Sequence, residues 1–163
     1  MLVYIQQDYG KNNLRNNPMD EFDEYKYMLG ETVMLYQFVE NDLKLIYAGL
    51  MDGNYYQNIE KVRATFKGLG QVIQALEALD NSDGRPYFNR ETYELLNRLA
   101  RYRNFYCHQC CVEFCYNPDF RNSVEFKDGF EKLKRTNESI KYVQEQTQKF
   151  RLDVLRRFKG IKQ

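Results

Sequence analysis

An arginine, an asparagine and the chain's only histidine lie close together in the stretch Arg103-Asn104-Phe105-Tyr106-Cys107-His108. At about 100° per residue of an α-helix, Asn104 and His108 fall one turn apart, and Arg103 lies roughly 140° from His108. A guanidinium is always charged and binds phosphate through a planar fork, and an imidazole titrates near neutrality. The three residue types therefore suit acid-base and anion-stabilising work on a phosphoryl group. The alternative interpretation is a satisfied core histidine, with Arg103 reaching solvent.

Four segments of helical periodicity organise the chain and must position this motif. We expect helices at Asp20 to Asp52, Tyr55 to Leu79, Asn89 to Tyr116 and about Val124 to Phe158, the last being one long helix or two. The motif lies in the third, whose apolar residues cover nearly its whole circumference. That pattern is typical of a helix at the centre of a bundle or at a subunit interface.

The predicted fold class is all-α, a four-helix up-and-down bundle with a long C-terminal helix. The polar stretch 1–19, which contains Gly10 and Pro18, predicts a flexible N-terminal tail. Residues 20–160 are expected to form a single helical domain, because 163 residues suffice for one core and no internal repeat is present.

Composition excludes some function classes. The net charge of +1 gives no strong electrostatic sign of a nucleic-acid or membrane surface, so an acidic ligand must meet a local cluster of cations. No apolar window is long enough for a membrane span, and the first residues do not form a signal peptide. We therefore expect a cytoplasmic protein without a membrane partner, whose four cysteines are thiols.

The cysteines at 107, 110, 111 and 115 raise the question of a zinc site around His108. Residues four apart rise about 6 Å along one helix. Cys107 and Cys115 therefore cannot both reach one ion at a ligand distance of about 2.3 Å. We expect no metal site and no cofactor, and interpret the thiols as small apolar groups.

Three further charged residues are candidates for a supporting role. Glu40 falls within about 40° of Tyr36 and Tyr47, in the apolar stripe of its helix. It either forms a structural ion pair or orients Arg103 or His108. Arg98 and Arg101 lie on another side of the third helix, where they could track flanking phosphates of a nucleic acid or simply face solvent.

The motif in its helical setting resembles the HEPN superfamily, whose members carry an arginine, a polar residue, three spacers and a histidine in the third or fourth helix. The resemblance covers roughly Glu21 to Phe158, and Arg103 to His108 carry it. A weaker similarity is the Gly-containing segment Thr65 to Ile73. Some HEPN toxins have a tyrosine two residues after the histidine, which a partner enzyme modifies; here Cys110 occupies that position.

The resemblance implies a metal-independent endoribonuclease in toxin or phage-defence biology, which needs no cofactor and acts on RNA at a homodimer interface. Arg103, Asn104 and His108 would be catalytic, and an antitoxin or regulatory protein could be a partner. Cleavage by the ribose 2′-hydroxyl needs both a base and an acid, and leaves a cyclic phosphate. Because one chain has one histidine, a two-fold axis would supply the second. The alternative function is a non-catalytic helical module that binds a partner protein.

Overall fold

The structure, a computed structural model, describes residues 19–82, 84, 86–112 and 114–159. These residues form α1 (Glu21–Leu50), α2 (Tyr55–Thr65), α3 (Leu69–Asp80), α4 (Arg90–His108), a 3-10 turn η1 (Phe120–Asn122) and α5 (Val124–Lys159), and none of them forms a strand. The predicted all-α class is confirmed. The predicted N-terminal tail lies, except for Met19, outside the described residues.

The prediction of one continuous helix from Tyr55 to Leu79 is wrong, because the structure has two helices there. Between α2 and α3 the backbone leaves the helical conformation, with φ −93° and ψ 116° at Phe66 and φ −167° and ψ 164° at Gly68. The apolar spacing continues across this break because Val62 and Leu69 are both buried on either side of it. The described chain therefore has five α-helices where we predicted four.

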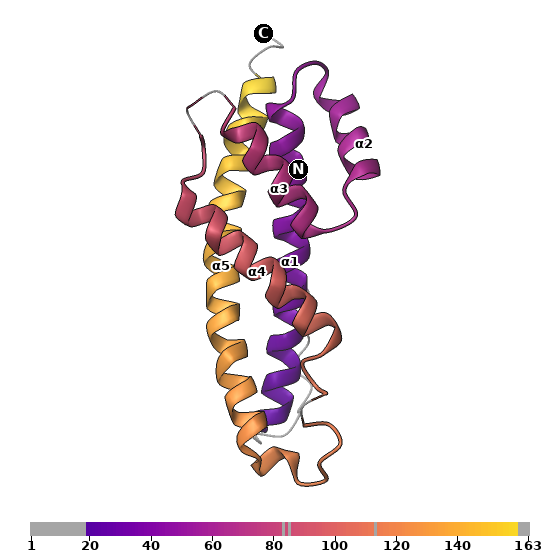
Figure 1. Cartoon of the computed structure of the whole chain (residues 1–163), viewed down its shortest axis with the longest axis vertical. Coiled ribbons are helices and arrows are strands. Elements are labelled where there is room, and N and C mark those ends of the chain that lie inside the picture. The colour runs from indigo at the N-terminus through magenta and orange to yellow at the C-terminus, as the bar shows by residue number, and fades with distance from the viewer. Residues whose placement is uncertain (1–18, 83, 85, 113, 160–163) are drawn as a thin grey trace, which may run out of the picture.

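The extra reversal makes the first and last helices parallel, where an up-and-down bundle of four would make them antiparallel. Contacts between α1 and α5 advance together along both helices: Phe22 meets Phe126, Thr32 meets Asn137, and Asp42 meets Arg151. Figure 1 shows the two long helices side by side, with both N-termini at the same end. This pair spans the length of the molecule, and the three shorter helices pack against it.

Two polar contacts inside this pair fix its register. The buried Asn137 amide donates to Thr32 Oγ1 at 2.9 Å and to Glu31 Oε2 at 3.0 Å. Farther along, Arg151 Nε lies 3.0 Å from Asp42 Oδ1, although its N–H does not point along a hydrogen bond. Burial raises the pKa of the Asp42 carboxyl, and the Arg151 charge acts in the opposite direction. Sliding one helix along the other would leave these polar groups buried without partners, which costs free energy.

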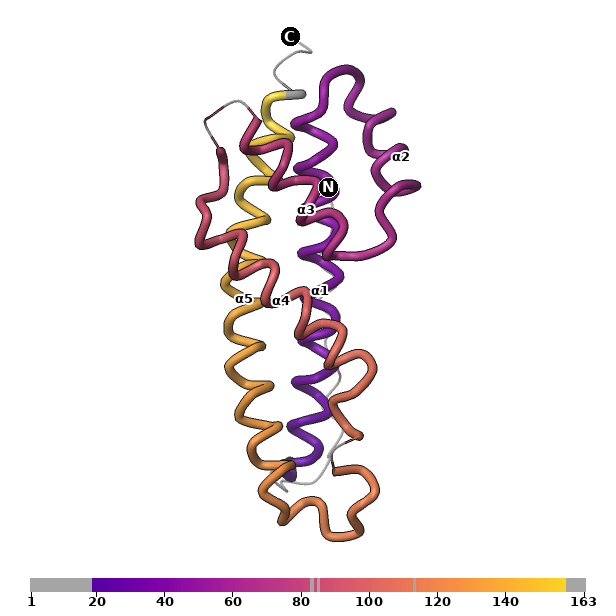
Figure 2. Tube along the Cα trace, in the orientation of Figure 1, coloured from indigo at the N-terminus to yellow at the C-terminus, as the bar shows by residue number. Residues whose placement is uncertain are grey.

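The position of α4 depends on a buried carboxylate at the end of α3. Asp80 accepts hydrogen bonds from the backbone N–H groups of Tyr87 (2.8 Å) and Phe88 (3.0 Å), and from the Tyr93 hydroxyl (2.8 Å). Phe88 then packs on Phe150 of α5, with 4.5 Å between ring centroids. These contacts hold the start of α4 against α5. From there α4 crosses the long pair obliquely, as Figure 2 shows in the same orientation as Figure 1.

Asn89 caps α4, since its side chain accepts from Thr92 N at 2.9 Å, and the helix therefore starts one residue after the predicted first residue. The predicted end at Tyr116 is wrong: α4 ends at His108, and turns follow it. Cys110 and Phe114, beyond the end, are still buried, which explains why the apolar pattern continues. The expectation of an apolar surface all round is also wrong. The outward side of α4 carries exposed polar residues, namely Glu94, Arg98, Arg101, Asn104 and His108.

One large core lies between α1, α3, α4 and α5, and a smaller cluster joins α2 to the end of α1 through Ala48, Tyr55 and Val62. The core ends in a group of contacting rings that includes Tyr25, Phe114 and Phe126. Each described helix falls short of the length or the apolar character that crossing a bilayer requires.

We expect Asp80→Asn to destabilise the protein, because the NH2 group of asparagine replaces one of the two carboxylate oxygens and turns a donor toward the donors that this oxygen had bonded. The lost charge-assisted hydrogen bonds should cost about 3 kcal/mol, which corresponds to a Tm lower by roughly 6–12 °C in a chain of this size. Thermal unfolding followed by circular dichroism measures the change. Asp52→Asn, at an exposed carboxylate, is the matched control and should leave the Tm unchanged. Equal melting of the two variants would contradict the role given to Asp80.

Candidate functional site

The structure brings Arg103 and Asn104 into a cleft between α3 and α4. The cleft has a volume of about 510 Å³, and its lining includes Arg101, Arg103, Asn104 and the segment Gly68-Leu69-Gly70. The two parts of the sequence that carry the family resemblance therefore meet at one place. None of the described residues that line the cleft is a carboxylate, so its two arginines give it a positive potential.

The start of α3 adds hydrogen-bond donors to this cleft. Its N-cap residue is Gly68, which has no side chain to bond the first N–H groups of the helix. The N–H groups of Gln71 and Val72 reach the Gly68 carbonyl, and Gln71 Oε1 bonds the N–H of Lys67. The N–H groups of Leu69 and Gly70 find no acceptor among the described residues. A helix N-terminus with free N–H groups favours an anion.

Within the motif, Arg103 Nη1 donates to Asn104 Oδ1 at 3.2 Å. This bond between neighbouring side chains holds the guanidinium toward Asn104 at the mouth of the cleft. The guanidinium has five N–H donors, so most of them stay available for an anion. The pair can therefore present a fixed cation to a phosphate that also reaches the start of α3.

His108 lies outside this cleft. It is the last residue of α4, it is exposed, and it has no hydrogen bond or ion pair with any described residue. The interpretation as a satisfied core histidine is therefore wrong. One copy of the chain brings together the arginine and the asparagine of the motif and leaves the histidine free on the surface beside them.

Glu40 pairs with Lys44 on the same helix. Lys44 Nζ lies 2.7 Å from Glu40 Oε1, and the two side chains are 17% and 19% exposed. No described interaction joins Glu40 to Arg103 or His108. The structure thus shows the ion pair that the sequence left as one of two alternatives, and a supporting role of Glu40 in catalysis stays a prediction.

Arg98 and Arg101 are about 60° apart on the outward side of α4, and they line different hollows. Arg101 lines the cleft against α3, whereas Arg98 lines a separate groove against α5. The cleft is also lined by Asn97, Gln71 and Gln74, none of which was predicted as a site residue. Helical spacing could have found Asn97, because positions 97, 101 and 104 fall within about 60° on a helix.

The four cysteines surround the end of α4 without forming one cluster. Cys110 is buried and donates from Sγ to the Tyr106 carbonyl at 3.2 Å, and its Sγ lies 3.7 Å from that of Cys111. Cys107 and Cys115 are exposed. Burial raises the pKa of the Cys111 thiol to about 11, with the neighbouring Cys110 as the next cause. Among the described residues, no three metal-binding side chains converge on a common point.

We expect iodoacetamide at pH 7.5 to modify Cys107 and Cys115 well before Cys110 and Cys111. The reactive species is the thiolate, and the thiol of Cys111 is almost completely protonated at this pH. Mass spectrometry of peptides from a time course measures the four rates. In 6 M urea the rates should converge, which serves as the control. Modification of Cys111 as fast as that of Cys115 in the folded protein would contradict the structure.

No family model matches the sequence, and no curated protein and no solved structure matches the chain. The HEPN superfamily therefore stays a prediction from the motif. The chemistry of the cleft and of the residues beside it is what indicates the function.

Proposed function

We propose that this chain is a metal-independent endoribonuclease of the HEPN type. The observation that supports it most is the cleft between α3 and α4, where two arginines, Asn104 and two free backbone N–H groups converge without a carboxylate. Such a set of donors suits the charge on a phosphate under nucleophilic attack. Arg103 binds the scissile phosphate, Asn104 orients the guanidinium, and Arg101 contacts a neighbouring phosphate.

His108 supplies proton transfer in this proposal. It takes the proton of the attacking ribose 2′-hydroxyl or gives one to the departing 5′-oxygen, and the product is a cyclic phosphate. One imidazole cannot be base and acid at the same moment, so a concerted displacement needs two of them. Because His108 lies outside the cleft of its own chain, we place the active site at a homodimer interface, where the histidines of two copies approach the cleft.

The HEPN-like character of the fold belongs to the same proposal. The motif lies in the fourth α-helix, which fits the resemblance, and the Gly68–Gly70 segment faces it across the cleft. By the same resemblance, we propose a cytoplasmic toxin or phage-defence role, in which an antitoxin or another regulatory protein controls the activity.

One observation favours the alternative, a module that binds a partner protein. Tyr27, Met34 and Phe38 are 69%, 54% and 55% exposed on the outside of α1. Their spacing places them within about 40° of one another on the helix. A row of exposed apolar side chains suits a protein contact. If purified protein never cuts RNA, this surface becomes the better guide to function.

We expect purified protein to cut single-stranded RNA in EDTA and to leave 2′,3′-cyclic phosphate ends. His108→Ala should lower the rate about 10²–10⁴-fold, because it removes proton transfer. Arg103→Ala should have an effect of about 10²–10³-fold, because it removes charge stabilisation. Arg63→Ala, at an exposed arginine paired with Glu60 on α2, is the control and should cut at the wild-type rate. Cleavage that EDTA abolishes, or that survives His108→Ala, would refute the mechanism.

We expect Gly70→Ala to weaken RNA binding without lowering the stability of the fold. A Cβ at this position meets no atom within 4 Å, so the protein can accommodate it, and alanine favours the helix over glycine by up to about 1 kcal/mol. The Tm should therefore hold or rise. The methyl group would keep a phosphate from the N–H of Gly70, and loss of that charge-assisted bond should weaken RNA binding at least about tenfold.

Gly30→Ala is the matched control for this experiment. Gly30 lies in α1, and a Cβ there also meets no atom within 4 Å. The control should gain a similar increment of stability and bind RNA like the wild type. Equal RNA affinity of the two variants, measured by fluorescence anisotropy, would show that no phosphate approaches the start of α3.

A further inference from the structure

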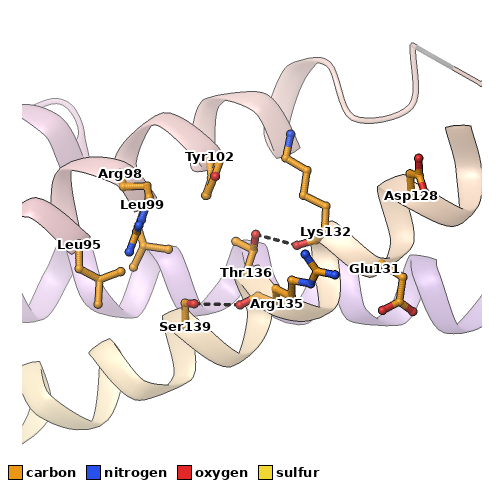
Figure 3. A pocket seen from close by; sticks show the side chains of 10 residues that line it. All are labelled: Leu95, Arg98, Leu99, Tyr102, Asp128, Glu131, Lys132, Arg135, Thr136 and Ser139. Carbon is orange, nitrogen blue, oxygen red and sulfur yellow. Dashed lines mark hydrogen bonds between the residues drawn. The ribbon is translucent and has the colours of Figure 1, made fainter.

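A second hollow lies on the opposite flank of α4, between this helix and α5. It has a volume of about 560 Å³, within the range of small-ligand sites. Figure 3 shows that Arg98 and Tyr102 enter it from α4, and Lys132 and Arg135 from α5. We call it the α4–α5 groove. Lys132 and Asp128 also line a smaller hollow of about 230 Å³ toward the start of α5, so the two hollows adjoin.

The cations of the groove form no close ion pair and can meet a ligand. Arg98, Lys132 and Arg135 have no described carboxylate within 4 Å, whereas Lys134, Lys141, Arg151 and Arg156 of α5 each do. The charge of Arg135 acts on Glu131 from a longer distance, and together with the Lys134 hydrogen bond, which is the larger cause, it lowers the pKa of that carboxyl. Lys132 Nζ lies over aromatic rings instead, 4.4 Å from the centroid of Phe105 and 5.5 Å from that of Tyr102. An ammonium group has three donors, and those that do not point at a ring can bond an anion.

The wall of the groove is apolar beneath these cations. Leu95, Leu99 and the ring of Tyr102 line it from α4. The Thr136 and Ser139 hydroxyls in the groove already donate to the backbone carbonyls one turn earlier, at 2.9 Å each. A ligand that fits must therefore combine a flat or apolar part with negative charge. A nucleotide combines a base with a phosphate in this way.

Only α4 separates this groove from the cleft that holds Arg103. Arg98 and Arg101 are both exposed and lie three residues apart on the outward side of the helix, and each faces one of the two hollows. A flexible anionic chain that leaves the cleft past Arg101 meets Arg98 next and enters the groove. Two cations one turn apart thus bridge the two hollows over the helix.

We propose that the α4–α5 groove binds the single-stranded RNA that flanks the scissile phosphate. Arg98, Lys132 and Arg135 contact its phosphates, and a base or ribose lies against Tyr102. This proposal rests on the ribonuclease function proposed above, and it adds a binding subsite that the motif does not contain.

The charge distribution in the groove also gives the strand a preferred path. Asp128 and Glu131 lie at the end away from Arg98, as Figure 3 shows, and Glu131 pairs with Lys134 at 2.8 Å. Asp128 forms no ion pair with any described residue. Its carboxylate repels phosphate, so the strand stays near Arg98 and Arg135 and turns to solvent before it reaches Asp128.

The test measures binding apart from catalysis. A fluorescein-labelled ten-nucleotide RNA with 2′-O-methyl groups cannot be cut by 2′-hydroxyl attack, and anisotropy gives its affinity for the full chain. We expect Arg98→Gln/Arg135→Gln to lower the affinity at least tenfold. The slope of log affinity against log salt should fall by about 1.4, because each phosphate contact to a single strand contributes about 0.7.

The matched control is Arg63→Gln/Arg156→Gln, which removes the same charge from two exposed arginines outside the groove. It should bind like the wild type. Equal affinities of the control and the groove variant, or no binding of the RNA by the wild type in 50 mM salt, would overturn the proposal. Thermal unfolding of each variant shows that the comparison is between folded proteins.

Asp128→Asn should change the RNA affinity in the opposite direction to the arginine substitutions. Removal of the repelling carboxylate should tighten RNA binding and raise the affinity by a few fold. Weaker binding in this variant would mean that the carboxylate takes part in attraction, as for a basic peptide, and would overturn RNA as the ligand. Tyr102→Leu should lower the affinity between about fivefold and a hundredfold, and Tyr102→Phe should retain it.

The experiment distinguishes this inference from the proposed function. If the groove variant loses affinity but unmodified RNA is never cut by the wild type, the groove stands and the ribonuclease mechanism fails. If the wild type cuts unmodified RNA, and the groove variant cuts a ten-nucleotide RNA that carries free 2′-hydroxyl groups with an unchanged KM, the mechanism stands and the groove proposal fails.

Discussion

The parallel packing of α1 against α5 is the constraint on which the rest of the molecule depends. Each long helix has one side buried against the other, and the contacts from Phe22–Phe126 to Asp42–Arg151 leave a single register. Most helical stability in proteins comes from such packing and not from the intrinsic propensity of a helix. Without this pair, α3 and α4 would have no surface to cover, because their buried residues face the two long helices and each other.

The oblique course of α4 follows from its two anchors on this pair. Asp80 and Phe88 hold its start against the far end of α5. Near its other end, the Tyr106 hydroxyl lies 3.2 Å from Thr136 Oγ1, much closer to the start of α5. A helix fixed at these two places has a hollow on each flank, one against α3 and one against α5. The same geometry therefore sets both the cleft of Arg103 and the groove of Arg98.

The sequence predicted the ends of helices well where a side chain or a glycine marks them. Asp20 and Asn89 cap α1 and α4, and Gly53, at φ 101°, follows the end of α1. The prediction of helix ends failed where buried residues continue past the point at which the helix stops. Phe66 in the α2–α3 turn, and Cys110 and Phe114 after α4, continue the apolar pattern although the backbone there is not α-helical. Periodicity records which residues are buried and does not record whether the helix between them is continuous.

The candidate site was predictable in part for the same reason. Helical spacing placed Arg103 and Asn104 on one helix but could not show which neighbour faces them. The partner is the start of α3, which exists only because the predicted second helix is broken at Phe66–Gly68. The pairing of Glu40 with Lys44 was open to prediction, since oppositely charged residues four apart on a helix are neighbours. The separation of Arg98 from Arg101 depends on where α5 runs, and no local pattern contains that information.

The parallel arrangement of α1 and α5 also determines how the domain would bear a mechanical load. Helix α1 begins at one end of the long pair, and α5 finishes at the opposite end, as Figure 1 shows. A force that pulls these two points apart drives α1 and α5 past each other along their shared axis. The aromatic contacts, the Asn137 hydrogen bonds and the Asp42–Arg151 pair then carry the load at the same time. Two antiparallel helices pulled from the same end would instead separate one turn after another, so this domain is built to resist shear.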